Sequence, residues 1–76
     1  MFTDADFREL LGFIGQKLSD LRHARHEKME TVARAVGIRQ SVMSQIEQGR
    51  YEDLGFELLW NLANYYKVEL GYIFAR

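Results

Sequence analysis

The chain has 76 residues, enough for one domain covering residues 1–76 with a single hydrophobic core, and its 10 basic and 11 acidic side chains give a formal net charge of −1. It contains no Cys, which excludes disulfides and thiolate metal sites. No apolar run approaches the ~20 residues of a membrane span or follows a basic leader, so we expect a cytoplasmic protein with no membrane partner.

The first third of the chain is predicted to be helical, because its apolar residues recur at intervals of three and four. Thr3 or Asp4 stands where a capping residue is expected. Gly12 and Gly15 weaken the pattern because glycine has low helix propensity. Two interpretations stay open: one long helix with a bend, or a break that makes residues 4–11 a separate short helix.

Residues 32–49 have the pattern of two short helices joined by a tight turn. Two sets of apolar side chains have helical spacing, one on each predicted helix: Val32, Ala33 and Val36, then Met43 and Ile46. Between them Gly37 can adopt the left-handed backbone that ends a helix, and Ile38 can fill the corner. Ala33 is small enough to let the two helices approach closely, as a helix-turn-helix requires.

The second of these helices carries its polar side chains on the face opposite its apolar pair. These side chains are Gln40, Ser41, Ser44, Gln45 and Gln48. A Gln amide can make two hydrogen bonds to adenine, Ser can donate or accept one, and Val42 offers an apolar surface to a thymine methyl group. The pattern therefore predicts a DNA-reading helix, with bases contacted by Gln40, Ser41, Val42 and Gln45.

The C-terminal third is predicted to form a fourth helix and a short fifth one. Asp53 is a plausible cap for the fourth helix, which runs to about Tyr66. Its stripe facing the helix-turn-helix combines Leu58 or Leu59 with Leu62, Ala63 and Tyr66. The whole chain is therefore expected to be all-α.

Seven residues in the central segment resemble the pattern of the Cro/repressor-type (XRE-like) helix-turn-helix family: Ala33, Gly37, Ile38, Ser44, Ile46, Glu47 and Gly49. The resemblance covers about residues 13–74. It implies a compact five-helix repressor-like domain, with the helix-turn-helix at about residues 29–48 and an N-terminal extension of the first helix. It also implies a structural ion pair between Arg22 and Glu47, and double-stranded DNA as partner.

The chain departs from the family pattern at several contact positions. Glu27, Lys28 and Met29 replace the usual Leu-Ser/Thr-Gln at the start of the second helix, so a Gln contact is missing, and Glu27 partly cancels the field of Lys28. Arg39 replaces a capping Ser or Thr. Lys67 replaces a turn Gly, which predicts a turn that is either somewhat strained or differently shaped. We expect phosphate contacts from Lys17, Lys28, Arg39, Ser44 and Arg50.

Charge is unevenly distributed along the chain, although the total is close to zero. Between Gln16 and Arg50 there are seven basic and four acidic residues, so this segment has a net positive charge. Residues 1–15 and residues 51–76 each have a net negative charge. The positive segment coincides with the predicted reading helix. We therefore expect weak non-specific DNA binding. The affinity for a specific site should depend strongly on base contacts and on binding by the two reading helices of a dimer.

Aromatic side chains are concentrated outside the helix-turn-helix, and one core cannot easily bury all of them. A surface containing Trp60, Tyr65, Tyr72 and Phe74 is predicted to bind a second copy or another protein. The alternative is that the N-terminal segment with Phe2 and Phe7 folds over these side chains within one chain.

The other residue clusters do not support catalysis or metal binding. His23, His26, Glu27 and Glu30 resemble a metal-ligand spacing, but such side chains on a charged helix are usually solvated, so no metal or other cofactor is expected. Ser19, Asp20 and His23 lie on one helix without oxyanion donors, and no enzyme activity is expected.

Two functional hypotheses follow from the sequence. The first is a sequence-specific transcriptional regulator, a repressor that acts as a homodimer on a near-palindromic operator. The alternative is a protein-interaction module, such as an antitoxin that captures a toxin, with DNA binding used for autoregulation or lost.

Overall fold

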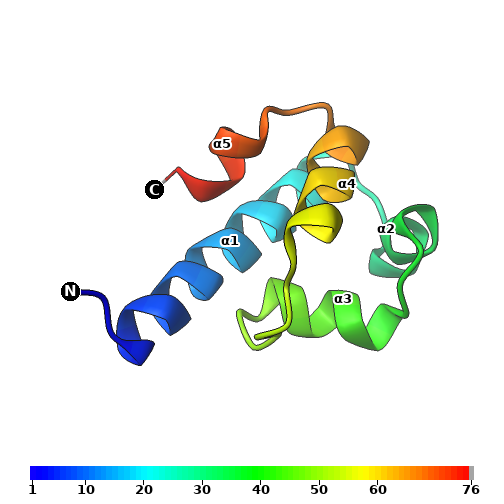
Figure 1. The fold of residues 1–76 in the computed structure, drawn as a ribbon. Helices are drawn as coiled ribbons and strands as arrows, with labels where there is room; N and C mark the ends of the chain where they lie inside the picture. The colour runs from blue at the N-terminus through cyan, green and yellow to red at the C-terminus, as the bar shows by residue number, and fades with distance from the viewer. Residues whose placement is uncertain (76) are drawn as a thin grey trace.

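Residues 1–75, which this computed structural model describes, form five α-helices and no β-strand (Figure 1). The helices are α1 (Asp4–Ala24), α2 (Met29–Val36), α3 (Gln40–Glu47), α4 (Phe56–Tyr66) and α5 (Leu70–Phe74). The expected all-α, five-helix fold is confirmed. None of these helices combines the length and apolar character needed to cross a membrane.

The first helix is continuous, which decides between the two interpretations of its glycines. Thr3 caps α1, and the Asp6 amide donates to the Thr3 hydroxyl at 3.3 Å. The Asp6 carboxylate in turn accepts from the Thr3 amide at 2.9 Å, completing a capping box. In Figure 1 the first turns of α1 extend beyond the other helices. The expected N-terminal extension of the first helix is therefore present as uninterrupted helix.

The turn between α2 and α3 has the predicted geometry. Gly37 lies in the left-handed region with a φ of 79°, where a side chain would be strained. The Ile38 amide donates to the Ala33 carbonyl at 2.9 Å, which satisfies one of the last carbonyls of α2. The Ile38 side chain is half-buried against the core. This turn directs α3 away from α2 at a steep angle (Figure 1).

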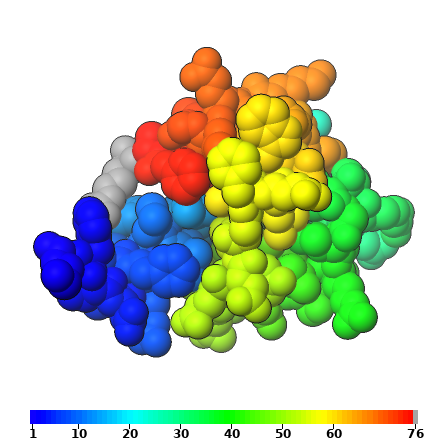
Figure 2. Space-filling view, viewed as in Figure 1, coloured from blue at the N-terminus to red at the C-terminus, as the bar shows by residue number. Residues whose placement is uncertain are grey.

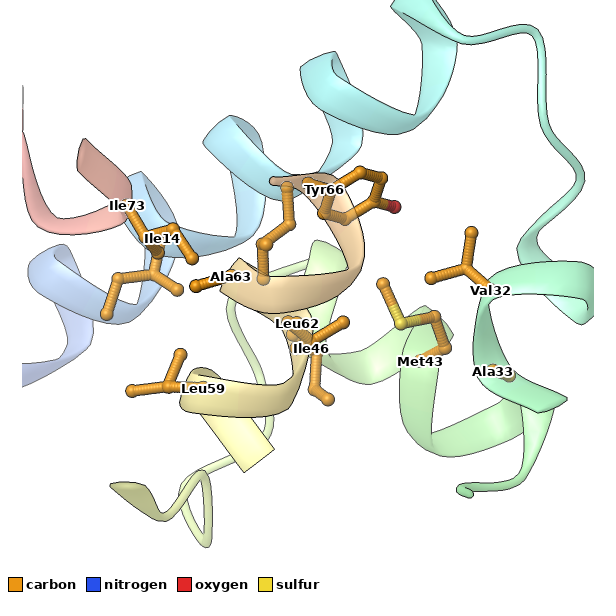
Figure 3. Close-up of a cluster of buried hydrophobic side chains, with 11 residues drawn as sticks. Ile14, Val32, Ala33, Met43, Ile46, Leu59, Leu62, Ala63, Tyr66 and Ile73 are labelled. Carbon is orange, nitrogen blue, oxygen red and sulfur yellow. The ribbon is translucent and has the colours of Figure 1, made fainter. Parts of the chain in front are cut away.

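The core lies where α1, α2, α3 and α4 converge, and α5 closes one end of it (Figure 3). Met43 and Ile46 of α3 are buried, and Met43 points toward Val32 of α2. On α4 the buried residue is Leu59, while Leu58 is only half-buried, which settles the alternative left open by the sequence. The polar face of α3 is therefore directed outward.

Two features of α4 bear on the sequence predictions. The predicted cap at Asp53 is wrong, because α4 begins at Phe56 and its N-cap is Gly55, which has no side chain for a hydrogen bond. At the other end, Lys67 adopts a left-handed conformation with a φ of 58°, a region that is uncommon for non-glycine residues. This conformation agrees with the strain expected at that turn.

The hydroxyl of Tyr66 lies at the edge of the core, buried and without a hydrogen-bond partner among residues 1–75 (Figure 3). Burial raises the pKa of this hydroxyl, and the carboxylates of Glu47 and Glu27 raise it further. Because the folded state favours the protonated phenol, the stability that this shift contributes is present below the ordinary tyrosine pKa of about 10. It is lost as the pH rises above that value.

We therefore expect Tyr66→Phe to raise the free energy of unfolding by about 1 kcal/mol at pH 7, because an unsatisfied buried hydroxyl is removed. The variant should also lose less stability than the wild type between pH 8 and about 11. A residual loss will remain, since the hydrogen bond to Glu27 also raises the pKa of Tyr65. Urea unfolding at a series of pH values measures both effects. A less stable variant at pH 7 would show that the hydroxyl makes a favourable interaction.

Candidate nucleic-acid interface

The outer face of α3 presents polar side chains to solvent. Gln40, Ser41 and Gln45 are exposed, whereas Met43 and Ile46 on the opposite face are 0% and 1% exposed. Figure 1 shows α3 along one edge of the molecule, with no other helix outside it. A helix that is buried on one side and polar on the other, held at an edge, has the shape needed to enter a major groove.

Val42 and Ser44 are less available than the other predicted contact residues. Both are half-buried, and Val42 packs against the hydrophobic core. The Ser44 hydroxyl accepts a hydrogen bond from the Gln48 side-chain amide at 3.0 Å. Only part of the Val42 surface is therefore open to a thymine methyl group.

Three of the predicted phosphate-contacting cations are exposed. Arg39 and Lys28 are the N-caps of α3 and α2, and neither side chain makes a capping hydrogen bond. Arg50 follows Gly49, which has a φ of 72°, and its amide donates to the Gln45 carbonyl at 2.9 Å. All three charged groups are thus attached to the helix-turn-helix or to the residues directly after it.

Lys17 lies elsewhere on the molecule. Its ammonium group is 4.4 Å from the centre of the Tyr72 ring on α5. Gly15, two residues earlier, faces α3, and two helical steps turn a side chain to the far face of α1. The structure therefore does not bring Lys17 together with the other predicted contact residues.

An ion pair holds the C-terminal end of α3 to α1. The Nε and Nη2 atoms of Arg22 donate to the two carboxylate oxygens of Glu47 at 2.8 and 3.0 Å. The side chains are only 13% and 5% exposed, and the hydrogen bonds to Glu47 raise the pKa of Arg22. A bidentate pair of this kind fixes orientation as well as distance. It therefore helps to fix the orientation of α3 relative to α1.

Close backbone packing between α1 and α3 is a feature that the sequence analysis missed. A Cβ atom built on Gly15 would lie 2.3 Å from the Ile46 carbonyl oxygen and 2.7 Å from that of Glu47. A Cβ on Gly49 would lie 2.7 Å from the Gly12 Cα. The two glycines that lower the helix propensity of α1 are therefore the positions where the end of α3 crosses it.

A second missed feature ties the α1–α2 turn to the end of α4. The Tyr65 hydroxyl donates a hydrogen bond to the Glu27 carboxylate, and Arg25 Nε lies 2.7 Å from the same carboxylate. The Arg22 Nη1 atom donates to the Glu27 carbonyl at 3.0 Å. Tyr65 thus makes contacts within its own chain, next to the start of α2.

The helix-turn-helix family model matches residues 18–73, which is most of the chain and includes α2, α3 and the Arg22–Glu47 pair. The chain belongs to the Cro/repressor-type (XRE-like) helix-turn-helix family. Members are DNA-binding transcriptional regulators rather than enzymes. No curated protein and no solved structure matched this chain.

The match to the helix-turn-helix family begins at residue 18, so most of α1 lies outside it. This N-terminal segment includes Gly15, which packs against the end of α3, and Gly12, which packs against Gly49. Within residues 1–75, no group of three His, Asp or Glu side chains is placed to hold a metal ion.

Exposed aromatic side chains remain on α4 and α5 of this helix-turn-helix domain. Phe56, Trp60 and Phe74 are 67%, 51% and 38% exposed, and the Phe56 and Trp60 rings stack with their centres 6.3 Å apart. Figure 2 shows side chains of α4 and α5 meeting on one face. Phe2 is 93% exposed, so the idea that the N-terminal segment folds over these aromatics is wrong.

Proposed function

We propose that this chain is a sequence-specific repressor that reads bases through Gln40, Ser41, Val42 and Gln45. The observation that carries the proposal is the outward polar face of α3, which is held by a buried apolar face and by the Arg22–Glu47 pair. The amides of Gln40 and Gln45 suit adenine, and Ser41 suits several bases. Val42 contributes only its exposed part.

Register on the duplex comes from contacts to phosphates. Arg39, Lys28 and Arg50 are the main candidates, because they border α2 and α3 and are exposed. Ser44 adds a weaker contact at most, since its hydroxyl already accepts from Gln48. Lys17 contributes to the general positive field rather than to a direct contact.

The repressor acts as a homodimer, with the aromatic surface of α4 and α5 as the interface. Phe56, Trp60 and Phe74 together leave on the order of 300 Å² of aromatic surface in water, close to the largest patch that monomeric proteins usually show. With a polar rim, this surface suits an interface of about 800 Å² per partner. Of the other two predicted residues, Tyr72 contacts Lys17 of α1 and Tyr65 is engaged with Glu27.

Selection from a randomised duplex pool at near-physiological salt tests the proposed function. We expect a near-palindromic motif with half-sites about one helical turn apart, roughly 34 Å. Fluorescence anisotropy on the recovered duplex at two salt concentrations then gives the affinity and its salt dependence. Recovery of no motif, with weak salt-sensitive binding alone, would contradict the proposal.

The exposed Phe56–Trp60 pair also favours a second function, an antitoxin-like module whose aromatic surface captures a protein partner. In that case DNA binding serves autoregulation or is lost. The two functions differ in what Trp60→Glu does. In the homodimer it separates the two copies and weakens operator binding, whereas in the interaction module it abolishes capture of the partner and leaves the affinity for DNA unchanged.

A further inference from the structure

The start of α2 carries a charge conflict. Lys28, the N-cap of α2, is exposed and is proposed to contact a phosphate, yet Glu27 directly precedes it. A carboxylate exposed beside Lys28 would repel the DNA backbone. A unit charge about 4 Å from another in water changes an equilibrium by about fivefold. The placement of the Glu27 side chain therefore affects what Lys28 can do.

The structure turns the Glu27 carboxylate toward the protein. One oxygen accepts the Tyr65 hydroxyl, and the other lies 2.7 Å from Arg25 Nε. The Glu27 side chain is 19% exposed, although it lies in a surface turn. Oε2 thus accepts a hydrogen bond, whereas Oε1 is buried beside the Arg25 guanidinium and accepts no hydrogen bond from residues 1–75.

The backbone and the neighbouring rings hold this arrangement in place. His26, directly before Glu27, adopts a left-handed φ of 54°, which reverses the chain between α1 and α2. Arg25 Nη1 donates to the Tyr65 carbonyl at 2.9 Å, and its guanidinium lies 4.8 Å from the centre of the Tyr65 ring. Arg25 therefore contacts both Tyr65 and Glu27.

We propose that Tyr65 and Arg25 form a clamp that withdraws the charge of Glu27 from the DNA-facing surface, so that Lys28 can contact a phosphate. Tyr65 is then a positioning residue for DNA binding, acting through Glu27 without touching DNA. This inference rests on the proposed function. The clamp would also explain how Lys28 can contact a phosphate although the acidic residue Glu27 directly precedes it.

A double-mutant cycle tests the clamp: the wild type, Tyr65→Phe, Glu27→Gln and the double variant, each binding the selected operator at two salt concentrations. Tyr65→Phe should weaken binding by about two- to fivefold, because the remaining contact with the 42%-exposed Arg25 side chain supplies no hydrogen bond to Glu27 and restrains it only weakly. The slope of log K against log salt should fall by up to about 0.9, the value of one phosphate contact.

Rescue separates the clamp from a merely structural role of Tyr65. In the Glu27→Gln background no carboxylate is released, so Tyr65→Phe should leave both affinity and salt slope unchanged. Tyr66→Phe, which removes the neighbouring hydroxyl that has no hydrogen-bond partner among residues 1–75, is the matched control and should have no effect on binding. Circular dichroism with urea unfolding shows that each variant is folded under the binding conditions.

Each other outcome overturns the clamp. An equal loss of affinity with Glu27 present and in the Glu27→Gln background means that Tyr65 acts on the fold alone, and no loss in Tyr65→Phe means that Glu27 does not oppose Lys28. If Tyr65→Phe is unstable, Tyr65→Trp retains an aromatic ring without the hydroxyl and must show the same rescue. No operator binding by the wild type would instead overturn the proposed function, a result that is recognised before any variant is compared.

Discussion

Gly15→Ala is expected to destabilise the domain by about 3 kcal/mol. The added Cβ would lie 2.3 Å from the Ile46 carbonyl oxygen and 2.9 Å from the Glu47 carbonyl carbon. These are backbone atoms of α3, so no flexible side chain can move aside. Either α3 shifts away from α1, or the Arg22–Glu47 pair and the buried contacts of Ile46 are lost. A core of this size supplies roughly 3 to 5 kcal/mol in total, so a large fraction of the molecules should be unfolded at 37 °C.

Gly12→Ala is the matched control, because it makes the same change on the same helix, three residues earlier. A Cβ on Gly12 meets no atom within 4 Å, so the gain in helix propensity should raise the free energy of unfolding by about 0.5 to 1 kcal/mol. Thermal and urea unfolding followed by circular dichroism compare the two variants. Equal effects from both substitutions would disprove the close crossing of α1 and α3.

Replacing Gln40, Ser41 and Gln45 together by Ala should abolish sequence-specific binding. Each lost base contact costs about 1 to 3 kcal/mol of discrimination, so the affinity for the operator should fall at least 100-fold, to about that for unrelated DNA. The salt dependence should persist, because Arg39, Lys28 and Arg50 are unchanged. The three side chains are exposed, so the fold should not be affected. Anisotropy on the selected operator and on a scrambled duplex measures the difference.

Asn61→Ala provides a matched control, because it removes an exposed amide side chain on α4, outside the helix-turn-helix. This substitution should leave operator affinity unchanged. If the triple variant on α3 also keeps its affinity, the assignment of α3 as the reading helix is wrong.

The fold was largely predictable because its signals are local. The 3–4 spacing on α2, α3 and α4 matches the buried residues, and the left-handed Gly37 follows from its place between two apolar faces. The start of α4 was not predictable from a capping residue. Asp53 has the right chemistry, but the helix begins only at Phe56 after Gly55, where no side-chain cap marks its start.

Apart from the Arg22–Glu47 pair, which the family resemblance implies, the long-range contacts of the site could not be predicted from the sequence. Gly12 and Gly15 appeared only as helix breakers, because nothing near them shows that Gly49 and the end of α3 cross there. Glu27 was interpreted as weakening Lys28, since its partner Tyr65 is 38 residues away. Composition and spacing indicate which residue types lie on a helix, but not which carboxylate accepts a hydrogen bond from a distant hydroxyl.

The different N-terminal caps of the helices have a consequence for how the molecule opens. α1 begins with a complete capping box, whereas α2 and α3, each of 8 residues, begin at Lys28 and Arg39 without any side-chain cap. Short helices with uncapped amides open at lower free energy than a long capped one. By this argument α2 and α3 should open more readily than α1, which provides the more persistent scaffold. In the proposed complex with DNA, the bound protein would be better protected from proteolysis than the free one, so its lifetime would depend on how much of it is bound.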